Sequence, residues 1–93
     1  MRLSVVIPAH NEEGSLAETV ISISTALLGE AIEHEIIVVN DHSSDGTAAI
    51  LDTLEADVPG LRVLENTGPG GFGYAVRFGL ERFDGDCVAV MMA

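Results

Sequence analysis

The stretch IIVVNDHSSDGT, residues 36–47, decides the fold. Its first half is an unbroken run of β-branched apolar residues, 36–39, which is typical of a strand buried on both faces of a parallel sheet. Its second half places a cluster of polar side chains, residues 40–45, directly before Gly46 and Thr47. Such a cluster has two interpretations. It is either the turn that starts a helix, or it holds a ligand at the carboxyl end of the strand.

The chain on both sides of this stretch alternates between strand and helix patterns. Apolar runs predict strands at residues 3–8, 35–39, 61–64 and 87–92. Apolar residues at helical spacing predict helices at residues 12–28, from 44 or 45 to 57, and from the glycine-rich loop 68–73 to 83. We expect Asn11 to cap the first helix, and Val76, Leu80 and Phe83 to form the inward face of the third.

This order of elements predicts the class of fold. Crossovers between parallel strands are right-handed, so the helices are expected to cover both faces of the sheet. We therefore expect a β-α-β-α-β-α-β chain that forms an open, mostly parallel, Rossmann-like α/β sheet. The last predicted strand has no helix after it, so we expect residues 1–93 to be the truncated N-terminal part of a larger domain.

Size and charge limit the classes of partner. The chain has 93 residues, a formal net charge of −11, four arginines and no lysine, so we expect one small acidic domain that does not bind nucleic acid. It contains neither a signal-peptide pattern nor an apolar run of the roughly 18–20 residues that span a membrane. We expect a cytoplasmic location, and a buried, unreactive thiol at the lone Cys87.

Ligands of open parallel sheets bind beyond the carboxyl ends of the strands, and here that rule selects residues 8–13, 40–45 and 66–73. In the first segment, Glu12 and Glu13 are acidic residues that favour the start of a helix. The alternative is that Asn11 and Glu12 bind an amide or hydroxyl group of a ligand. In the second, a turn explains Asp41 poorly, because a carboxylate directly after a buried strand needs a partner.

Two further motifs suggest other ligands. The first motif is a match to the calcium-binding loop of an EF-hand. At loop positions one, three, five, six and twelve, this chain has Asp41, Ser43, Asp45, Gly46 and Asp52. An EF-hand needs a helix before its loop, whereas a strand is predicted there. The glycines of residues 68–73 match G-x-G-x-x-G, but a dinucleotide site needs that motif after the first strand. These glycines either let a ligand approach the backbone closely or serve a loop that needs positive φ.

Other classes of site find no support. The three histidines, His10, His34 and His42, lack the spacing of metal ligands, and satisfied or solvent-exposed rings are expected instead. No serine lies in a G-x-S-x-G motif, so a triad hydrolase is not expected.

Taken together, the motifs resemble the first half of the inverting family 2 glycosyltransferases, which have the GT-A fold. The resemblance is strongest to polyprenyl-phosphate sugar synthases of the dolichol-phosphate mannose synthase type. It rests on VVIPAHNEE at residues 5–13, IIVVNDHSSDGT at 36–47 and GFGYAVRFGL at 71–80, in that order. The final GDCVAVMMA, residues 85–93, stands where that family approaches its acidic metal-binding motif.

The resemblance implies a nucleoside-diphosphate sugar as donor and Mg²⁺ or Mn²⁺ as cofactor in the full-length protein. Pro8, Ala9 and Glu12 would line the pocket of the base, and Asp41 would bond to the base or ribose. Gly71 and Gly73 would border the pyrophosphate. With Asn11 from the positional argument, the expected donor-binding residues are Pro8, Ala9, Asn11, Glu12, Asp41, Gly71 and Gly73. The resemblance also suggests a lipid phosphate as the acceptor, at the cytoplasmic face of a membrane.

The sequence also departs from the family pattern. Asn40 replaces the first of two usual aspartates, and His42 stands where glycine is common. Aligned from Gly85, the first aspartate of the metal motif falls on Met92 and the second beyond the chain. We therefore expect residues 1–93 to be the nucleotide-binding half of a GT-A domain that is inactive alone and able to self-associate. The alternatives are a non-catalytic nucleotide- or metabolite-binding α/β module and a fragment of a dinucleotide-dependent oxidoreductase.

Overall fold

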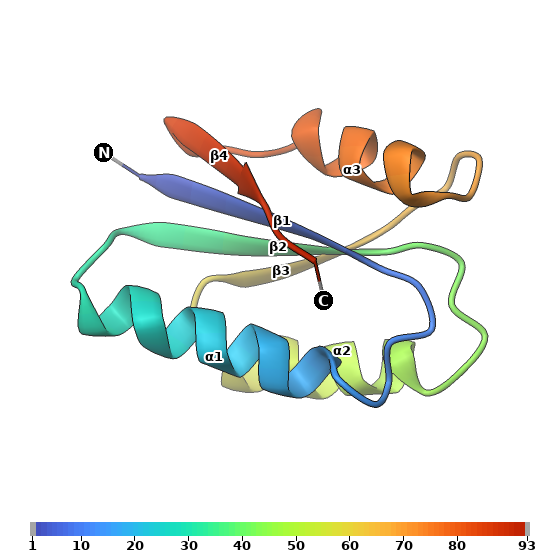
Figure 1. Ribbon diagram of the computed structural model, residues 1–93, viewed down its shortest axis with the longest axis horizontal. Helices are drawn as coiled ribbons and strands as arrows, with labels where there is room; N and C mark the ends of the chain where they lie inside the picture. Colours follow the sequence, from blue (N-terminus) through green and yellow to red (C-terminus); the bar gives the residue numbers. More distant parts are fainter. Residues whose placement is uncertain (1, 93) are drawn as a thin grey trace.

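The computed structural model describes residues 2–92 and has the predicted alternation of strands and helices (Figure 1). The elements are β1 (Leu3–Ala9), α1 (Leu16–Gly29), β2 (His34–Asn40), α2 (Thr47–Asp57), β3 (Leu61–Glu65), α3 (Phe72–Leu80) and β4 (Cys87–Val90). The strands form one sheet in the order β3-β2-β1-β4, and all three pairings are parallel. Figure 1 shows α1 and α2 on one face of the sheet and α3 on the other, which confirms the expected open α/β architecture.

Each face of the sheet has its own apolar core because the side chains of β1 and β2 alternate between the two faces. The core under α1 and α2 contains Val5 and Ile7 of β1, Ile36 and Val38 of β2, and residues of the two helices, among them Leu16 and Leu51. The core under α3 is smaller, and its buried members are Val6, Ile37, Val39 and Ala75. Apolar packing on both faces explains the unbroken apolar run 36–39.

Several element boundaries differ from the sequence prediction. The first helix begins at Leu16 rather than at residue 12, and Asn11 does not cap it. The N-cap is Ser15, and Asn11 lies in the left-handed region with φ 51°. The third helix ends at Leu80 rather than at 83, and the last strand ends at Val90 rather than at 92. Cys87 is half-buried rather than buried.

The inward face of α3 also differs from the prediction. Ala75 and Gly79 are its buried residues, whereas Leu80 is 38% exposed. The helix lies so close to the sheet that a Cβ atom on Gly79 would come within 2.6 Å of Val6 Cγ1 and 3.2 Å of Val39 Cγ2. A missing side chain, which the apolar pattern could not reveal, therefore sets the distance between α3 and the sheet.

We expect Gly79→Ala to lower the free energy of unfolding by about 1–2 kcal/mol, because overpacking against Val6 outweighs the better helix propensity of alanine. Urea unfolding measures this change. Gly73→Ala is the matched control in the same helix, since a Cβ there would meet nothing within 4 Å. That control should leave the stability unchanged or raise it by up to about 1 kcal/mol. Equal stabilisation by both substitutions would contradict the close approach of α3.

A polar cluster holds the amino ends of the strands together. Glu35, which is 2% exposed, accepts hydrogen bonds from Ser4 Oγ at 2.6 Å and from the Asp84 N–H at 2.7 Å. Its other carboxylate oxygen lies 3.3 Å from Arg62 Nε and 3.8 Å from Arg2 Nη2. Burial raises the pKa of Glu35, but these hydrogen bonds and the two positive charges outweigh burial and lower that pKa overall.

β4 is an edge strand of the sheet, and the apolar residues at its end, Val90, Met91 and Met92, are exposed. Self-association of the chain through this strand stays a prediction.

Within residues 2–92, none of the helices combines the length and the apolar character that crossing a membrane requires.

Candidate functional site

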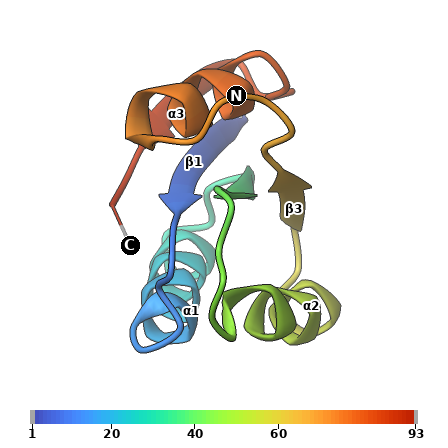
Figure 2. The ribbon, with the colours of Figure 1, turned by 90° about the vertical axis from the view of Figure 1, so that its right-hand side faces the viewer.

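Because the strands are parallel, their carboxyl ends all lie on the same side of the sheet, which faces the viewer in Figure 2 and is called the carboxyl edge below. The loops after β1, β2 and β3 meet there. The strand order also changes direction at β1. The chain first adds β2 and β3 on one side of β1 and then returns to place β4 on the other side. A reversal of this kind is the usual place for a ligand crevice in an open α/β sheet.

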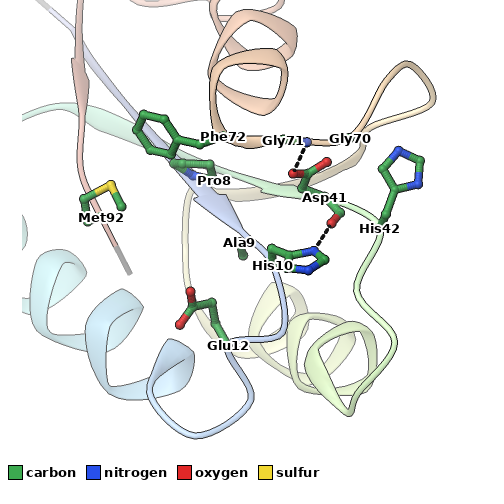
Figure 3. Close-up of a pocket in the computed structure, with 10 residues that line it drawn as sticks. All are labelled: Pro8, Ala9, His10, Glu12, Asp41, His42, Gly70, Gly71, Phe72 and Met92. Carbon is green, nitrogen blue, oxygen red and sulfur yellow. Dashed lines mark hydrogen bonds between the residues drawn. The ribbon is translucent and has the colours of Figure 1, made fainter.

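A cavity of about 450 Å³ lies at this edge (Figure 3). Its lining residues come from the end of β1, from the loops after β1, β2 and β3, from the start of α3 and from just beyond β4: Pro8, Ala9, His10, Glu12, Asp41, His42, Gly70, Gly71, Phe72 and Met92. Pro8 and Phe72 lie together on one side in Figure 3, and Glu12 lies across the cavity from them. The combination of apolar walls with a few polar groups suits a flat ring that carries hydrogen-bonding edges.

Asp41 is the buried polar residue of the cavity, at 4% exposure. Its Oδ1 accepts a hydrogen bond from Asn66 Nδ2 at 3.0 Å, and its Oδ2 accepts one from the Gly71 N–H at 2.9 Å. We expected the Asp41 carboxylate to have a hydrogen-bond partner, and Asn66 and Gly71 of the glycine-rich loop provide that partner. An ionised carboxylate has about four lone-pair positions, so Asp41 retains acceptor capacity toward the cavity.

The glycine-rich loop is folded around Asn66, which is 6% exposed. The Asn66 side chain donates to Asp41 and to the carbonyl of Pro69, and it accepts from the Gly68 N–H at 3.0 Å. Gly71 ends the loop with φ 129°, a backbone conformation that residues with a Cβ atom rarely adopt. The glycines thus serve the shape of a loop that borders the cavity.

Hydrogen bonds join the loop after β1 to the loop after β2. The Asn11 N–H donates to Ser43 Oγ at 3.1 Å, and Asn11 Oδ1 accepts from the Ser44 N–H at 2.7 Å. The Glu12 N–H donates to Thr47 Oγ1 at 3.0 Å. Asn11 therefore lies behind the cavity wall and holds the two loops together, while Glu12 faces the cavity.

Acidic residues strengthen this junction. Glu13 Oε2 accepts from the Gly46 N–H at 2.9 Å, and the Glu13 N–H donates to Asp45 Oδ2 at 3.3 Å. Hydrogen bonds from the Thr47 hydroxyl and from backbone N–H groups outweigh desolvation and lower the pKa of Asp45. Asp45 and Glu13 thus satisfy backbone donors at the start of α2.

The histidines of the site are satisfied by carbonyl groups, as expected. His10 Nδ1 donates to the Asp41 carbonyl at 2.6 Å, and His42 Nε2 donates to the Gly68 carbonyl at 2.8 Å. His34 Nδ1 makes a similar bond to Ile32 far from the cavity. His10 and His42 were not among the predicted donor-binding residues, although His10 directly follows β1 and His42 is the second residue after β2.

The other proposed site residues are distributed as follows. Pro8, Ala9, Glu12, Asp41 and Gly71 line the cavity, and Asn11 does not. Gly73 lies in the first turn of α3 and borders a separate depression with Gly70, Gly71, Tyr74 and Arg77. Gly70, Phe72 and Met92 also line the cavity but were not among the predicted donor-binding residues. The alignment with the metal motif had pointed to position 92, whereas only the folded chain shows that the start of α3 reaches the cavity.

The residues described here do not make a divalent-metal site. No group of three or more His, Cys, Asp or Glu side chains within residues 2–92 is arranged to hold a metal ion. Among the described residues that line the cavity, Glu12 and Asp41 are the only carboxylates, and the thioether of Met92 is a poor ligand for Mg²⁺. The EF-hand alternative is wrong, because β2 precedes the segment and α2 begins at Thr47 within it.

Comparison with known protein families gives a match over almost the whole chain. The sequence profile described as glycosyl transferase family 2 matches residues 4–93. Dolichol-phosphate mannosyltransferase of Pyrococcus furiosus is 37% identical over 93 residues, which are 100% of this chain and 26% of that protein. Undecaprenyl-phosphate mannosyltransferase of Micrococcus luteus is 39% identical over 87 residues, 88% of this chain and 34% of that protein.

A solved structure has the same arrangement of elements. The crystal structure of residues 1–349 of TarS from S. aureus matches with a TM-score of 0.83 and 27% sequence identity, over 99% of this chain and 27% of that one. The shared fold confirms the GT-A arrangement that the sequence resemblance implied. The chain spans about a quarter to a third of the length of the relatives that it matches.

Proposed function

Because this chain belongs to glycosyl transferase family 2, we propose that its cavity binds the nucleotide part of a nucleoside-diphosphate sugar. The observation that carries this proposal is the convergence of Pro8, Asp41 and Gly71 on one cavity at the carboxyl edge of the sheet. Pro8 lies near the end of β1, Asp41 in the loop after β2 and Gly71 in the loop after β3, and each was selected from the sequence as a donor-binding residue.

The nucleoside fits the inner part of the cavity. Pro8, Ala9 and Phe72 supply apolar surface for a flat base, while Asp41 supplies a charged acceptor for an N–H of the base or a hydroxyl of the ribose. Glu12 faces the same space and offers a second acceptor. Asn11 contributes indirectly by holding together the loops that carry Glu12 and Asp41.

The pyrophosphate fits the side of the cavity next to α3. Gly71 precedes the helix and Gly73 lies in its first turn, so the backbone there is open to close approach. The first N–H groups of a helix favour an anion. Such groups matter in a chain with a net charge of −11, which offers few cationic side chains to a diphosphate.

Sugar transfer itself is proposed for a protein longer than this chain, which spans 26% and 34% of two mannosyltransferases of the family. We propose that residues 1–93 form the nucleotide-binding half of a GT-A domain and are inactive alone. The names of both relatives include a polyprenyl-type phosphate, and we propose a lipid phosphate as the acceptor here. That acceptor would place the full-length protein at the cytoplasmic face of a membrane.

We also propose that Mg²⁺ or Mn²⁺ accompanies the diphosphate. The described residues do not form a site for the ion, so the oxygens of the diphosphate would be its main ligands. The ion would reduce the negative charge that the nucleotide brings to an acidic cavity. We therefore expect a nucleoside diphosphate to bind more weakly in EDTA than in Mg²⁺.

Calorimetry tests the proposed function directly. Titrations with UDP, GDP and NAD, each in Mg²⁺ and in EDTA, are expected to show binding of at least one diphosphate and no tight binding of NAD. The corresponding nucleosides, uridine and guanosine, separate the contribution of the base from that of the diphosphate. Tight binding of NAD without a response to either diphosphate would contradict the proposal and favour the dinucleotide alternative.

A further inference from the structure

In the structure, the glycine-rich loop comprises residues 66–71, between the end of β3 and the start of α3. Hydrogen bonds hold it to the rest of the molecule at both ends. Asn66 at its start and Gly71 at its end are both hydrogen-bonded to Asp41. The middle of the loop is held differently. His42 Nε2 donates to the Gly68 carbonyl at 2.8 Å, and within residues 2–92 no other side chain from outside the loop bonds to its middle.

The ring of His42 also packs against the loop. A Cβ atom on Gly70 would lie 3.2 Å from His42 Cδ2, so the ring covers the backbone of that glycine. Figure 3 shows His42 on the loop after β2, beside the glycine-rich loop and away from Glu12. The contact therefore joins the loop after β2, which carries Asp41, to the glycine-rich loop, which ends at Gly71.

His42 makes this contact from an unfavourable backbone conformation. Its φ is 53°, in the left-handed region that glycine adopts more readily than residues with a Cβ atom. A glycine at position 42 would relieve this strain, but it would remove both the hydrogen bond to Gly68 and the cover over Gly70. The conformation and the contact thus act in opposite directions on stability.

We propose that His42 is a positioning residue that holds the glycine-rich loop closed against the cavity and so sets the affinity for the diphosphate part of the ligand. The inference rests on the proposed function, because it concerns the wall next to the pyrophosphate. A loop that is closed only part of the time lowers the apparent affinity by the closed fraction. His42 raises that fraction before the ligand arrives.

The test uses His42→Gly with two readouts. Amide hydrogen exchange in the free protein at Gly68, Gly70 and Gly71, the residues of 68–71 that have an N–H, should become about 3- to 10-fold faster, the factor that corresponds to the loss of one hydrogen bond. The Kd of the nucleoside diphosphate that binds wild type should rise by about the same factor. The Tm should change by only a few degrees, because relief of the positive φ offsets the lost bond.

Two variants serve as controls. Ala31 is exposed, has φ 56° and lies far from the cavity, so Ala31→Gly relieves the same kind of strain without touching the loop. It should leave exchange at residues 68–71 and the Kd unchanged. His42→Gln keeps a side-chain N–H donor and should recover at least half of the loss in affinity on a logarithmic scale.

The outcomes separate the two proposals. Unchanged exchange at residues 68–71 in His42→Gly overturns the positioning role whether or not a nucleotide binds. Failure of the wild-type protein to bind any nucleoside diphosphate overturns the proposed function, and the exchange result then still decides whether His42 holds the loop. A His42→Gln variant as weak as His42→Gly would show that a side-chain N–H donor at position 42 does not hold the loop, and would overturn the role of the hydrogen bond.

Discussion

Asp41→Ala is expected to lower both stability and nucleotide affinity. Removing the carboxylate leaves the Gly71 N–H without its acceptor and takes one of two acceptors from the buried Asn66 side chain. Each unpaired buried polar group costs about 1–3 kcal/mol, so we expect the free energy of unfolding to fall by about 2–4 kcal/mol. Against a total of about 5–14 kcal/mol for a domain of this size, that is a large fraction.

The effect on binding has two causes. The variant lacks the charged acceptor that we propose for the base or ribose, and the glycine-rich loop loses both bonds that tie its ends to the second loop. We expect the Kd of the nucleoside diphosphate to rise at least 10-fold, in line with about 1.5–3 kcal/mol for a lost hydrogen bond to a charged group. Calorimetry at a temperature well below the Tm of the variant measures this rise on folded protein.

A matched substitution separates the role of Asp41 from the loss of one negative charge. Asp57 lies exposed at the end of α2 and makes no side-chain hydrogen bond among those found in residues 2–92, so Asp57→Ala removes the same charge elsewhere. It should leave the Kd unchanged and alter stability by less than about 0.5 kcal/mol. If Asp41→Ala were as stable and bound nucleotide as well as this control, the nucleoside would have been placed wrongly.

Glu35→Gln is expected to be strongly destabilising, although it lies away from the cavity. The glutamine keeps the volume of the side chain but loses the charge that faces Arg62 and Arg2, and it has one acceptor oxygen in place of two. That oxygen can still accept from the Ser4 hydroxyl and the Asp84 N–H, which already share Oε2 in the wild type, but the amide NH2 then faces the guanidinium groups as donor against donor. We expect a loss of about 2–3 kcal/mol at pH 7, limited because both arginines are partly exposed and regain water.

This loss should depend on pH in a defined direction. Because the pKa of Glu35 is lowered in the folded protein from its ordinary value of 4.5, its ionised form stabilises the fold fully above that value. The contribution disappears as the pH falls from 4.5 through the lowered folded-state pKa. The difference in unfolding free energy between wild type and Glu35→Gln should therefore shrink as the pH is lowered below 4.5.

Urea unfolding at several pH values between 7 and about 3 measures that difference. Glu33→Gln is the matched control, because Glu33 is exposed and lies two residues away from Glu35. It should change the stability by less than about 0.5 kcal/mol at each pH. A gap between wild type and Glu35→Gln that stays constant down to the lowest pH would show that the charge of Glu35 does not hold the cluster together.

Much of the fold and part of the site follow from the sequence. The apolar run 36–39 identifies a central strand, the polar residues after it mark the carboxyl edge, and the alternation of patterns gives the parallel α/β class. These features depend on neighbours a few positions apart, so local periodicity and turn chemistry are sufficient to read them. The motif spacing then led to the family.

The tertiary structure alone decided how those parts meet. It paired β4 with β1, gave Asp41 its partner in Asn66 across 25 positions of the chain, and brought Ser4 to Glu35 across 31. It also turned Gly79, which no apolar pattern marks, into the contact point of α3 with Val6. Such pairings depend on the packing of the whole chain at once, because an atom's long-range neighbours are set by the sum of many weak contacts rather than by the residues beside it.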